Sequence, residues 1–570
     1  MISLVTPRSA VPGAVGARLL PVKESRGSQR RGGAFYTQDF DPVAHSLGLT
    51  AIAAALPILT LIVLLGWVKM KAQWAALIAL VIASVVATVI YGMPVDQAAL
   101  SAAEGATFGL FPIMWIVVAA IWVYNMTVET GHFAVLRRSI AAVSEDQRVQ
   151  AVMIAFCFGT LLEALAGFGA PAAITAVMLV TLGFEPPKAA ALALLGNTAA
   201  VPFGAIGIPI TTLSDVTGLD ASELGAMVGR QTPLLGLIVP FVLIAIVDGR
   251  RGIRQAWPVA AVAGVAFALA QFACSNHISF ELTDIVASTS SIAAIVALLR
   301  VWSPVGPRVD APVRREDRSS DSPLDVMRAF GPYLIIVAVF SIAQLAAVKR
   351  ALAGSPWTTS FAWPGLDVRA PGGGLLSSVT FIFNWLPAAG TLMLISGLAT
   401  AAVIRLAPYR ALLVARATLT QLRTAILVVT AVLALAYVLN QSGQTLTLGL
   451  WAAGAGSFFP FLAPVIGWMG VAVTGSDTAS NALFGGMQVA VANDIGISPT
   501  LLAAANASGG VLGKMISAQH LAIAAAAVGI AGQEGPLLRK LVGWSVVLLG
   551  VLCALVYLQS TSALEWMVGK

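Results

Sequence analysis

Apolar runs of about twenty residues recur along almost the whole chain, and they limit its possible folds more than any other feature. A helix of that length crosses the ~30 Å hydrocarbon core of a bilayer. Hydrophobic residues make up 58% of the 570 positions and charged residues only 10%, so most of the chain belongs in lipid. We therefore predict an all-α polytopic membrane protein with roughly 12 to 14 transmembrane helices.

Composition and motifs exclude several other classes of protein. The sequence has no phosphate-binding glycine loop, nucleotide fingerprint or metal-ligand spacing, so we expect no metal, no cofactor and no ATP-driven pumping. The net charge of +7 does not require a nucleic acid, because Lys and Arg collect in the cytoplasmic loops of membrane proteins. The three cysteines lie in apolar stretches and are interpreted as small buried hydrophobic residues.

Changes in composition divide the chain into four parts. Residues 1–37 are rich in Gly, Ser and Arg and are expected to be a disordered basic tail. Residues 38–301 form the first transmembrane half and residues 328–570 the second. Between them, residues 302–327 are charged and contain Pro and Ser, which is typical of a solvated cytoplasmic linker.

A carboxylate interrupts one apolar run. Glu163 opens the string Glu163 to Pro171, which contains Gly167, Phe168 and Gly169. An ionisable group at membrane depth costs ~2.5–3.5 kcal/mol on insertion scales and is usually retained for transport or proton relay. The glycines and the proline break a regular helix, and a broken helix is tolerated at that depth only where it faces protein or a wet cavity. The string therefore predicts a binding site inside a membrane transporter.

The second half contains a matching interruption. Asp477 lies in the polar string 474–481, and it precedes Asn506 by 29 residues, whereas Glu163 precedes Asn197 by 34. Paired broken segments in corresponding places indicate two pseudo-symmetric halves with a site between them, built from broken helices or re-entrant hairpins. Two patches of small residues that let helices pack closely are the alternative, but packing alone does not require the charges.

These motifs suit a small carboxylate substrate carried together with a proton. The ends of broken helices favour anions, and burial raises the pKa of a carboxylic acid in general. The candidate substrate-binding residues are Gly167, Phe168, Gly169, Asn197, Thr198, Ser476, Ser480, Asn481, Asn506, Lys514, Ser517 and Gln519. The candidate proton-coupling residues are Glu163, Asp477 and His520.

Three alternatives remain open at this point. Lys514 could contact the substrate, balance Asp477, or extend to the membrane interface. His520 could titrate or be a hydrogen-bonded structural residue. Unwound backbone carbonyls could also hold sodium in place of a proton.

Long ordered strings carry a resemblance to a known family. They are Asp146-Gln147-Arg148, Glu163 to Pro171, Gly204 to Ile210, Met227 to Gln231, Thr474 to Thr478, and Gly513 to Ser517. Across residues 35–570 the chain resembles the L-lactate permease family. The resemblance implies a secondary active transporter, not an enzyme, in a bacterial-type inner membrane. It implies uptake of L-lactate, with D-lactate and glycolate, by proton symport.

The chain departs from that family pattern at one place. After Ser517 the family has Pro, Gln and Ser, whereas this chain has Ala518, Gln519 and His520. The runner-up function is a sodium-coupled carrier of other small carboxylates; an intramembrane enzyme and a passive anion channel are further alternatives. The expected partners are the lipid bilayer and a small hydroxy-monocarboxylate.

Overall fold

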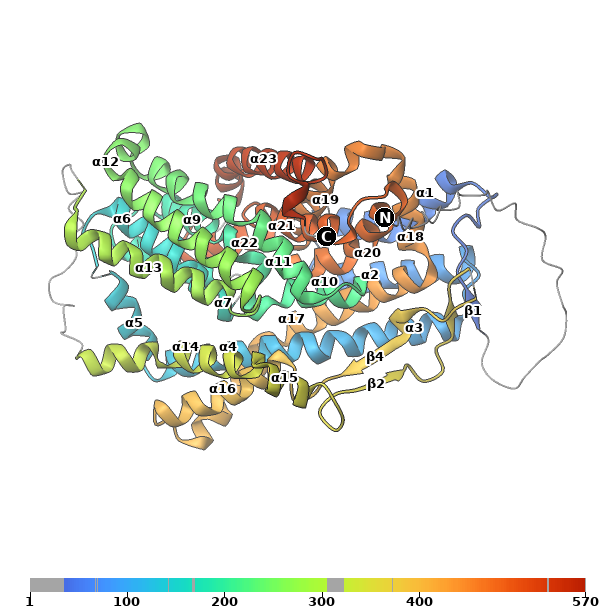
Figure 1. Cartoon of the computed structure of the whole chain (residues 1–570), viewed down its shortest axis with the longest axis horizontal. Coiled ribbons are helices and arrows are strands. Elements are labelled where there is room, and N and C mark those ends of the chain that lie inside the picture. Colours follow the sequence, from blue (N-terminus) through green and yellow to red (C-terminus); the bar gives the residue numbers. More distant parts are fainter. Residues whose placement is uncertain are drawn as a thin grey trace, which may run out of the picture.

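The structure is a computed structural model that describes residues 35–66, 68, 70–141, 143–166, 170–304, 322–371, 373–530 and 533–568. It is helical almost throughout, so the expected all-α polytopic class is confirmed. Figure 1 shows α4, α14 and α16 along one edge of the molecule and α23 along the other. Helices α10, α11, α20, α21 and α22 lie between these edges.

The helices before residue 302 range from short pieces to membrane-length segments. They are α1 (Leu47–Gly66), α2 (Ala72–Val85), α3 (Val95–Phe108), α4 (Trp115–Glu129), α5 (His132–Ala141), α6 (Gln147–Ala151), α7 (Gly159–Ala166), α8 (Ala170–Thr181), α9 (Pro186–Gly196), α10 (Gly204–Thr217), α11 (Ala221–Gln231), α12 (Pro233–His277) and α13 (Thr283–Val301). The π-helical turns η1 (Val86–Ile90), η2 (Gly109–Met114) and η3 (Val152–Phe158) and the 3₁₀ turn η4 (Thr198–Phe203) connect some of them.

The later part of the chain has the same character. Its helices are α14 (Pro323–Gln344), α15 (Ala346–Leu352), α16 (Ala389–Val403), α17 (Pro408–Ser442), α18 (Gln444–Ala452), α19 (Phe459–Thr474), α20 (Asp477–Ile495), α21 (Pro499–Lys514), α22 (Ala518–Ala527) and α23 (Glu534–Gln559). Its 3₁₀ turns are η6 (Ser377–Val379), η7 (Ala453–Phe458) and η8 (Glu565–Met567).

Eleven helical segments of the described chain are long and apolar enough to cross a membrane, against the 12 to 14 crossings expected. The number of segments is smaller because one of them, Ala221–His277, has 57 residues, far more than one crossing needs. It contains a sharp break at Asp248 and Gly249, whose backbone angles are not helical. Two further apolar helices, Pro171–Thr181 and Ala389–Val403, are shorter than a full crossing.

Helix α1 has one exposed apolar face and one face that packs against other helices. Leu49, Ile52, Leu56, Leu59 and Val63 recur every three or four residues and are exposed. Since residues with this spacing share one face of a helix, they form a single apolar stripe. The opposite face of α1 packs against α2 and α18. An exposed apolar stripe of this length is typical of a helix that faces lipid.

Four short strands lie outside the helical bundle. Strand β1 (Tyr36–Thr37) pairs in parallel with β3 (Val368–Arg369), and β2 (Thr359–Ala362) pairs antiparallel with β4 (Thr380–Phe383). In Figure 1, β1, β2 and β4 lie near the same end of the molecule as α3. Residues 1–34 of the expected tail lie outside the described part, but its last two residues form β1. Tyr36 is fixed there because its hydroxyl donates to the Ser442 carbonyl at 2.8 Å.

The expected linker 302–327 is shorter than predicted at its C-terminal end. Residues 305–321 lie outside the described part, and α14 already begins at Pro323. Ser322 caps this helix by accepting from the backbone N–H of Asp325, whose side chain in turn accepts from the backbone N–H of Ser322. Such a capping box with Pro at the first position is a strong helix start. It explains why charged residues near 325 are helical.

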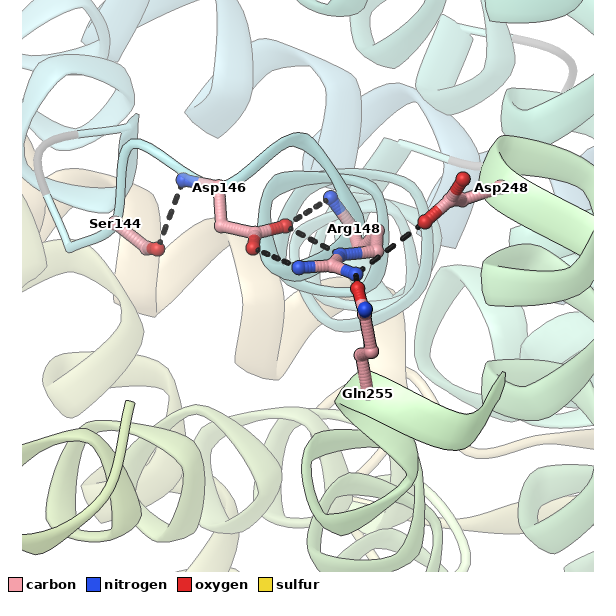
Figure 2. A network of polar contacts seen from close by, with 5 residues as sticks. All are labelled: Ser144, Asp146, Arg148, Asp248 and Gln255. Atoms are coloured by element: carbon pink, nitrogen blue, oxygen red, sulfur yellow. Dashed lines mark hydrogen bonds and ion pairs between the residues drawn. The ribbon is translucent and has the colours of Figure 1, made fainter. Parts of the chain in front are cut away.

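The string Asp146-Gln147-Arg148 has a structural role. Figure 2 shows Asp146, the N-cap of α6, accepting two hydrogen bonds from the Arg148 guanidinium, at 3.0 and 2.7 Å. The same guanidinium contacts Asp248 at 3.3 Å and Gln255 at 2.6 Å. Because Asp248 lies at the break of α12, this network ties the start of α6 to that break.

Candidate functional site

An ion pair buried between the two parts of the chain forms the centre of the site. Lys514, the last residue of α21, donates from Nζ to Oε1 of Glu163 in α7 at 2.5 Å. Their side chains are only 9% and 4% exposed. Asn197, which follows α9, donates from Nδ2 to the other carboxylate oxygen at 2.6 Å. Both oxygens of Glu163 are therefore engaged, and the buried charge of Lys514 is compensated.

The chain reaches this geometry by breaking its helices. Helix α10 begins with three consecutive residues in the left-handed region, Ala205, Ile206 and Gly207, with φ of 44°, 59° and 74°. For residues other than glycine this conformation costs ~1–2 kcal/mol each, so the surrounding packing must impose it. Gly204 precedes the break, and a Cβ there would lie 2.9 Å from Oε1 of Glu163. The glycine therefore permits the backbone to approach the ion pair.

A second break separates α19 from α20. Gly475 ends α19 with φ of 73°, and Ser476 caps α20 by accepting from the backbone N–H of Ala479 at 3.3 Å. Asp477 is the first residue of α20 and is buried. Neither of its carboxylate oxygens has a hydrogen-bond partner among the described residues. A Cβ on Gly510 of α21 would lie 2.1 Å from Oδ1 of Asp477, so only glycine leaves room there.

A cavity lies between these two breaks. Its polar lining consists of Glu163, Ser476, Asp477, Thr478, Lys514 and His520. Its other lining residues are Val201, Gly204, Ala205, Ile208, Pro209 and Gly475. The cavity measures about 40 Å³. Since ~10–15 Å³ on the same measure accommodates one water, it has room for a few waters or a very small solute. The first backbone N–H groups of α20 border this space, and a helix N-terminus attracts anions.

His520 borders the cavity and has a defined hydrogen-bonding state. Ser517 has a single hydroxyl proton, which it donates to the Lys514 carbonyl at 3.0 Å. The contact of 2.9 Å between Nδ1 of His520 and the Ser517 oxygen therefore has the imidazole as donor. Nε2 is then an acceptor, and it has no partner in the described structure. His520 and Lys514 also line a smaller neighbouring cavity with Asn197 and Thr198.

Several candidate residues are used in packing between helices and do not line the larger cavity. Ser480 donates to the Gly467 carbonyl at 3.2 Å, which joins α20 to α19. Asn481 donates to the Pro209 carbonyl at 3.1 Å and accepts from Asn506 at 2.9 Å. These bonds hold α20 and α21 against the broken start of α10.

The remaining candidates are placed less centrally. Thr198 donates its hydroxyl to the Leu195 carbonyl. Gln519 is exposed and lies beside Gly475, where a Cβ would be 2.6 Å from its side-chain oxygen. Gly167, Phe168 and Gly169 lie outside the described residues.

The two motif carboxylates do not occupy equivalent places in the two halves. Glu163 lies in α7, before its break, whereas Asp477 lies after the break that precedes α20. Similarly, Asn197 follows α9 but Asn506 lies inside α21. The match between the halves is therefore one of pattern and not of individual residues, because polar residues are placed by contacts across the fold rather than by position in a repeat.

The sequence interpretation missed Asp284. This residue, in the first turn of α13, is fully buried, and neither carboxylate oxygen has a partner in the described part of the chain. It lies within electrostatic reach of both Glu163 and Lys514. It stands at the edge of an apolar run, where the sequence pattern does not distinguish it from an ordinary interfacial carboxylate. The described residues contain no group of three His, Cys, Asp or Glu side chains suited to a metal ion.

The sequence of this chain is similar to those of known transport proteins. The family described as L-lactate permease matches residues 50–561. The L-lactate permease of Salmonella typhimurium (strain LT2) is 41% identical over 552 residues, which cover 94% of this chain and 99% of that protein. The glycolate permease of Escherichia coli (strain K12) is 40% identical over 553 residues, covering 92% and 98%. Among solved structures, the YdaH transporter of Alcanivorax borkumensis aligns with a TM-score of 0.42 and 14% identity, over 82% of this chain and 88% of that one.

Proposed function

Because the chain belongs to the L-lactate permease family, a family of multi-pass membrane transporters and not of enzymes, we propose that it takes up L-lactate by proton symport. D-lactate and glycolate are proposed as related substrates, since an L-lactate permease and a glycolate permease are similarly close relatives. The proposed location is the inner membrane of a bacterial-type cell. The observation that carries this proposal is the buried Lys514–Glu163 ion pair at the wall of the cavity.

The ion pair suggests how an anion and a proton are carried together. Lys514 carries one positive charge, which Glu163 already balances, so we expect a substrate carboxylate that binds Lys514 to displace Glu163. A displaced, ionised Glu163 would be an uncompensated buried charge, which is strongly unfavourable. Glu163 therefore takes up a proton as lactate takes its place. The site gains one negative and one positive charge, and its net charge does not change.

The other polar groups of the cavity fit the same substrate. The N-terminus of α20 adds a positive partial charge beside the substrate carboxylate. An ionised Asp477 would repel that carboxylate, whereas its neutral form can donate a hydrogen bond to it. Asn197, which donates to Glu163, can keep this hydrogen bond to the displaced side chain. Lys514, Asp477 and the backbone of residues 476–478 thus form the proposed anion site.

His520 is proposed to recognise the hydroxyl group of the substrate. Its free Nε2 is an acceptor beside Lys514, and the hydroxyl next to the carboxylate of a 2-hydroxy acid is a donor. We expect His520→Leu to weaken competition by L-lactate about 5- to 150-fold, the effect of losing ~1–3 kcal/mol at a buried polar group. Propionate, which lacks the hydroxyl, should compete equally well before and after the change. Inhibition of radiolabelled uptake by each acid measures this.

The control for this prediction is His277→Leu, because His277 is exposed at the end of α12. It should leave both inhibition constants unchanged. If His520→Leu weakened lactate and propionate equally, His520 would affect the site as a whole and not the hydroxyl.

Uptake of radiolabelled L-lactate into proteoliposomes tests the proposed function. An inward proton gradient should drive accumulation above the external concentration, and a protonophore should abolish it. Replacing external sodium by potassium should change nothing. Accumulation that follows the sodium gradient and ignores the proton gradient would contradict the proposal and favour a sodium-coupled carrier.

A further inference from the structure

We propose that the coupling proton reaches Glu163 through Asp284, by a route separate from the substrate cavity. This inference rests on the proposed function and adds the residue that supplies the proton. Asp284 is the fully buried carboxyl group of α13, and α13 packs against α7, which carries Glu163. It does not belong to the lining of either cavity described above.

The surroundings of Asp284 are those of a group that holds a proton. Its side chain is 0% exposed, and no donor in the described structure contacts either oxygen. Lys514, the cation within electrostatic reach, is already paired with Glu163. An anion without a partner at such a place is unfavourable, so Asp284 is a neutral acid while Glu163 occupies Lys514.

The turn between α12 and α13 connects Asp284 to the outside of the bundle. Glu281 lies in this turn, three residues before Asp284, and is partly exposed. It accepts a hydrogen bond from the Ser279 hydroxyl. Cys274 of α12 lies within electrostatic reach of both carboxyl groups. The proposed route therefore runs from Glu281 to Asp284 and then to Glu163.

The titratable groups near Asp284 lie on several neighbouring helices and on the turn before α13. They are Glu163 of α7, Lys514 of α21, Cys274 of α12 and Glu281 of the preceding turn. The 3₁₀ turn η4, which also packs against α13, has no titratable side chain. The π-helical turn η3 packs against α13 as well and carries Cys157, whose Sγ lies 3.2 Å from the Ser291 hydroxyl further along α13. Among the acidic groups, only Glu163 changes its partner when an anion binds Lys514.

The proposed step is a single proton transfer. When the substrate carboxylate displaces Glu163 from Lys514, the O–H bond of Asp284 breaks and an O–H bond forms on Glu163. Asp284 is left as the anion and regains a proton from water through the turn that carries Glu281. The sum is one proton taken from solvent for each anion bound.

Asp284→Asn tests this inference in proteoliposomes that contain a pH-sensitive dye. We expect lactate-driven proton entry to fall by at least about 100-fold, the smallest effect typical of removing a positioned acid or base. Exchange of internal for external lactate should continue, because without Asp284 the proton stays on Glu163 while one lactate leaves and the next one binds. Glu104→Gln is the matched control, because Glu104 is also a buried carboxyl group. It lies on α3, away from α7 and α13, and accepts a hydrogen bond from Gln441 of α17 at 2.7 Å. It should transport protons normally.

The outcomes separate this inference from the proposed function. Wild-type protein that shows no lactate-driven proton entry would overturn both. Wild-type entry that Asp284→Asn retains in full would overturn the Asp284 route alone. If Asp284→Asn does not reach the membrane, Glu281→Gln decides, since its partly exposed side chain tolerates the change. Slower proton entry with normal exchange supports the route, and unchanged entry overturns it.

Discussion

Lys514→Ala is expected to abolish concentrative lactate uptake and to destabilise the protein. The substitution removes the only cation that contacts Glu163 in the described structure and leaves that carboxylate buried without its partner. Removing one member of a buried ion pair costs ~3–5 kcal/mol. The loss of a desolvated charge contact of ~3 kcal/mol corresponds to a more than 100-fold weaker binding of lactate. Thermal unfolding of the purified protein with and without lactate measures both effects.

The double variant separates these two effects. Glu163→Gln combined with Lys514→Ala removes both charges, so much of the lost stability should return while lactate binding does not. In a double-mutant cycle, the effects of changing two residues in direct contact deviate from additivity by ~0.5–3 kcal/mol. Lys540→Ala, at an exposed position of α23, is the control and should behave as wild type. A stable Lys514→Ala protein with full lactate affinity would exclude Lys514 from the substrate site.

Glu163→Gln is expected to uncouple transport without preventing binding. The amide keeps the shape of the side chain but does not titrate, so gradient-driven accumulation should collapse. Lactate no longer competes with a carboxylate for Lys514, so its affinity should rise by about 5- to 150-fold, the range of typical coupling free energies. Exchange of labelled for unlabelled lactate should persist. Binding by isothermal titration and uptake into the same proteoliposomes check the two halves of this prediction.

Asp146→Asn is not a suitable control for that variant, because Asp146 anchors Arg148. Asp220→Asn is better, since Asp220 only caps α11 at the surface and Asn caps equally well. It should leave coupling intact. Full accumulation by Glu163→Gln would remove Glu163 from proton coupling and leave a packing role.

The central residues of the site could be predicted from the sequence because each is a polar exception in an apolar run. Glu163, Asp477 and Lys514 all line one cavity, although 351 positions separate Glu163 from Lys514. Their pairing could not be predicted. The sequence suggested Asp477 as a possible partner of Lys514, whereas the structure pairs Lys514 with Glu163. Contacts between distant segments depend on how the breaks at Gly204 and Gly475 orient their helices.

Other residues were missed or misplaced for a related reason. Asp284 begins a helix, where a carboxylate is ordinary, so only its complete burial distinguishes it. Ser480, Asn481 and Asn506 have the chemistry of substrate ligands, but their hydrogen bonds are to other protein groups. A polar side chain between membrane helices can bind a neighbour as readily as a ligand, and residue type alone does not separate the two.

The exchange of carboxylates on Lys514 is tested most directly by counting protons as lactate binds to the purified protein. Titration calorimetry in buffers of different ionisation enthalpy gives that number. We expect about one proton taken up for each lactate bound by the wild type, because a displaced Glu163 cannot remain charged in the buried site, and none in Glu163→Gln. Lactate binding to the wild type without proton uptake would contradict the account.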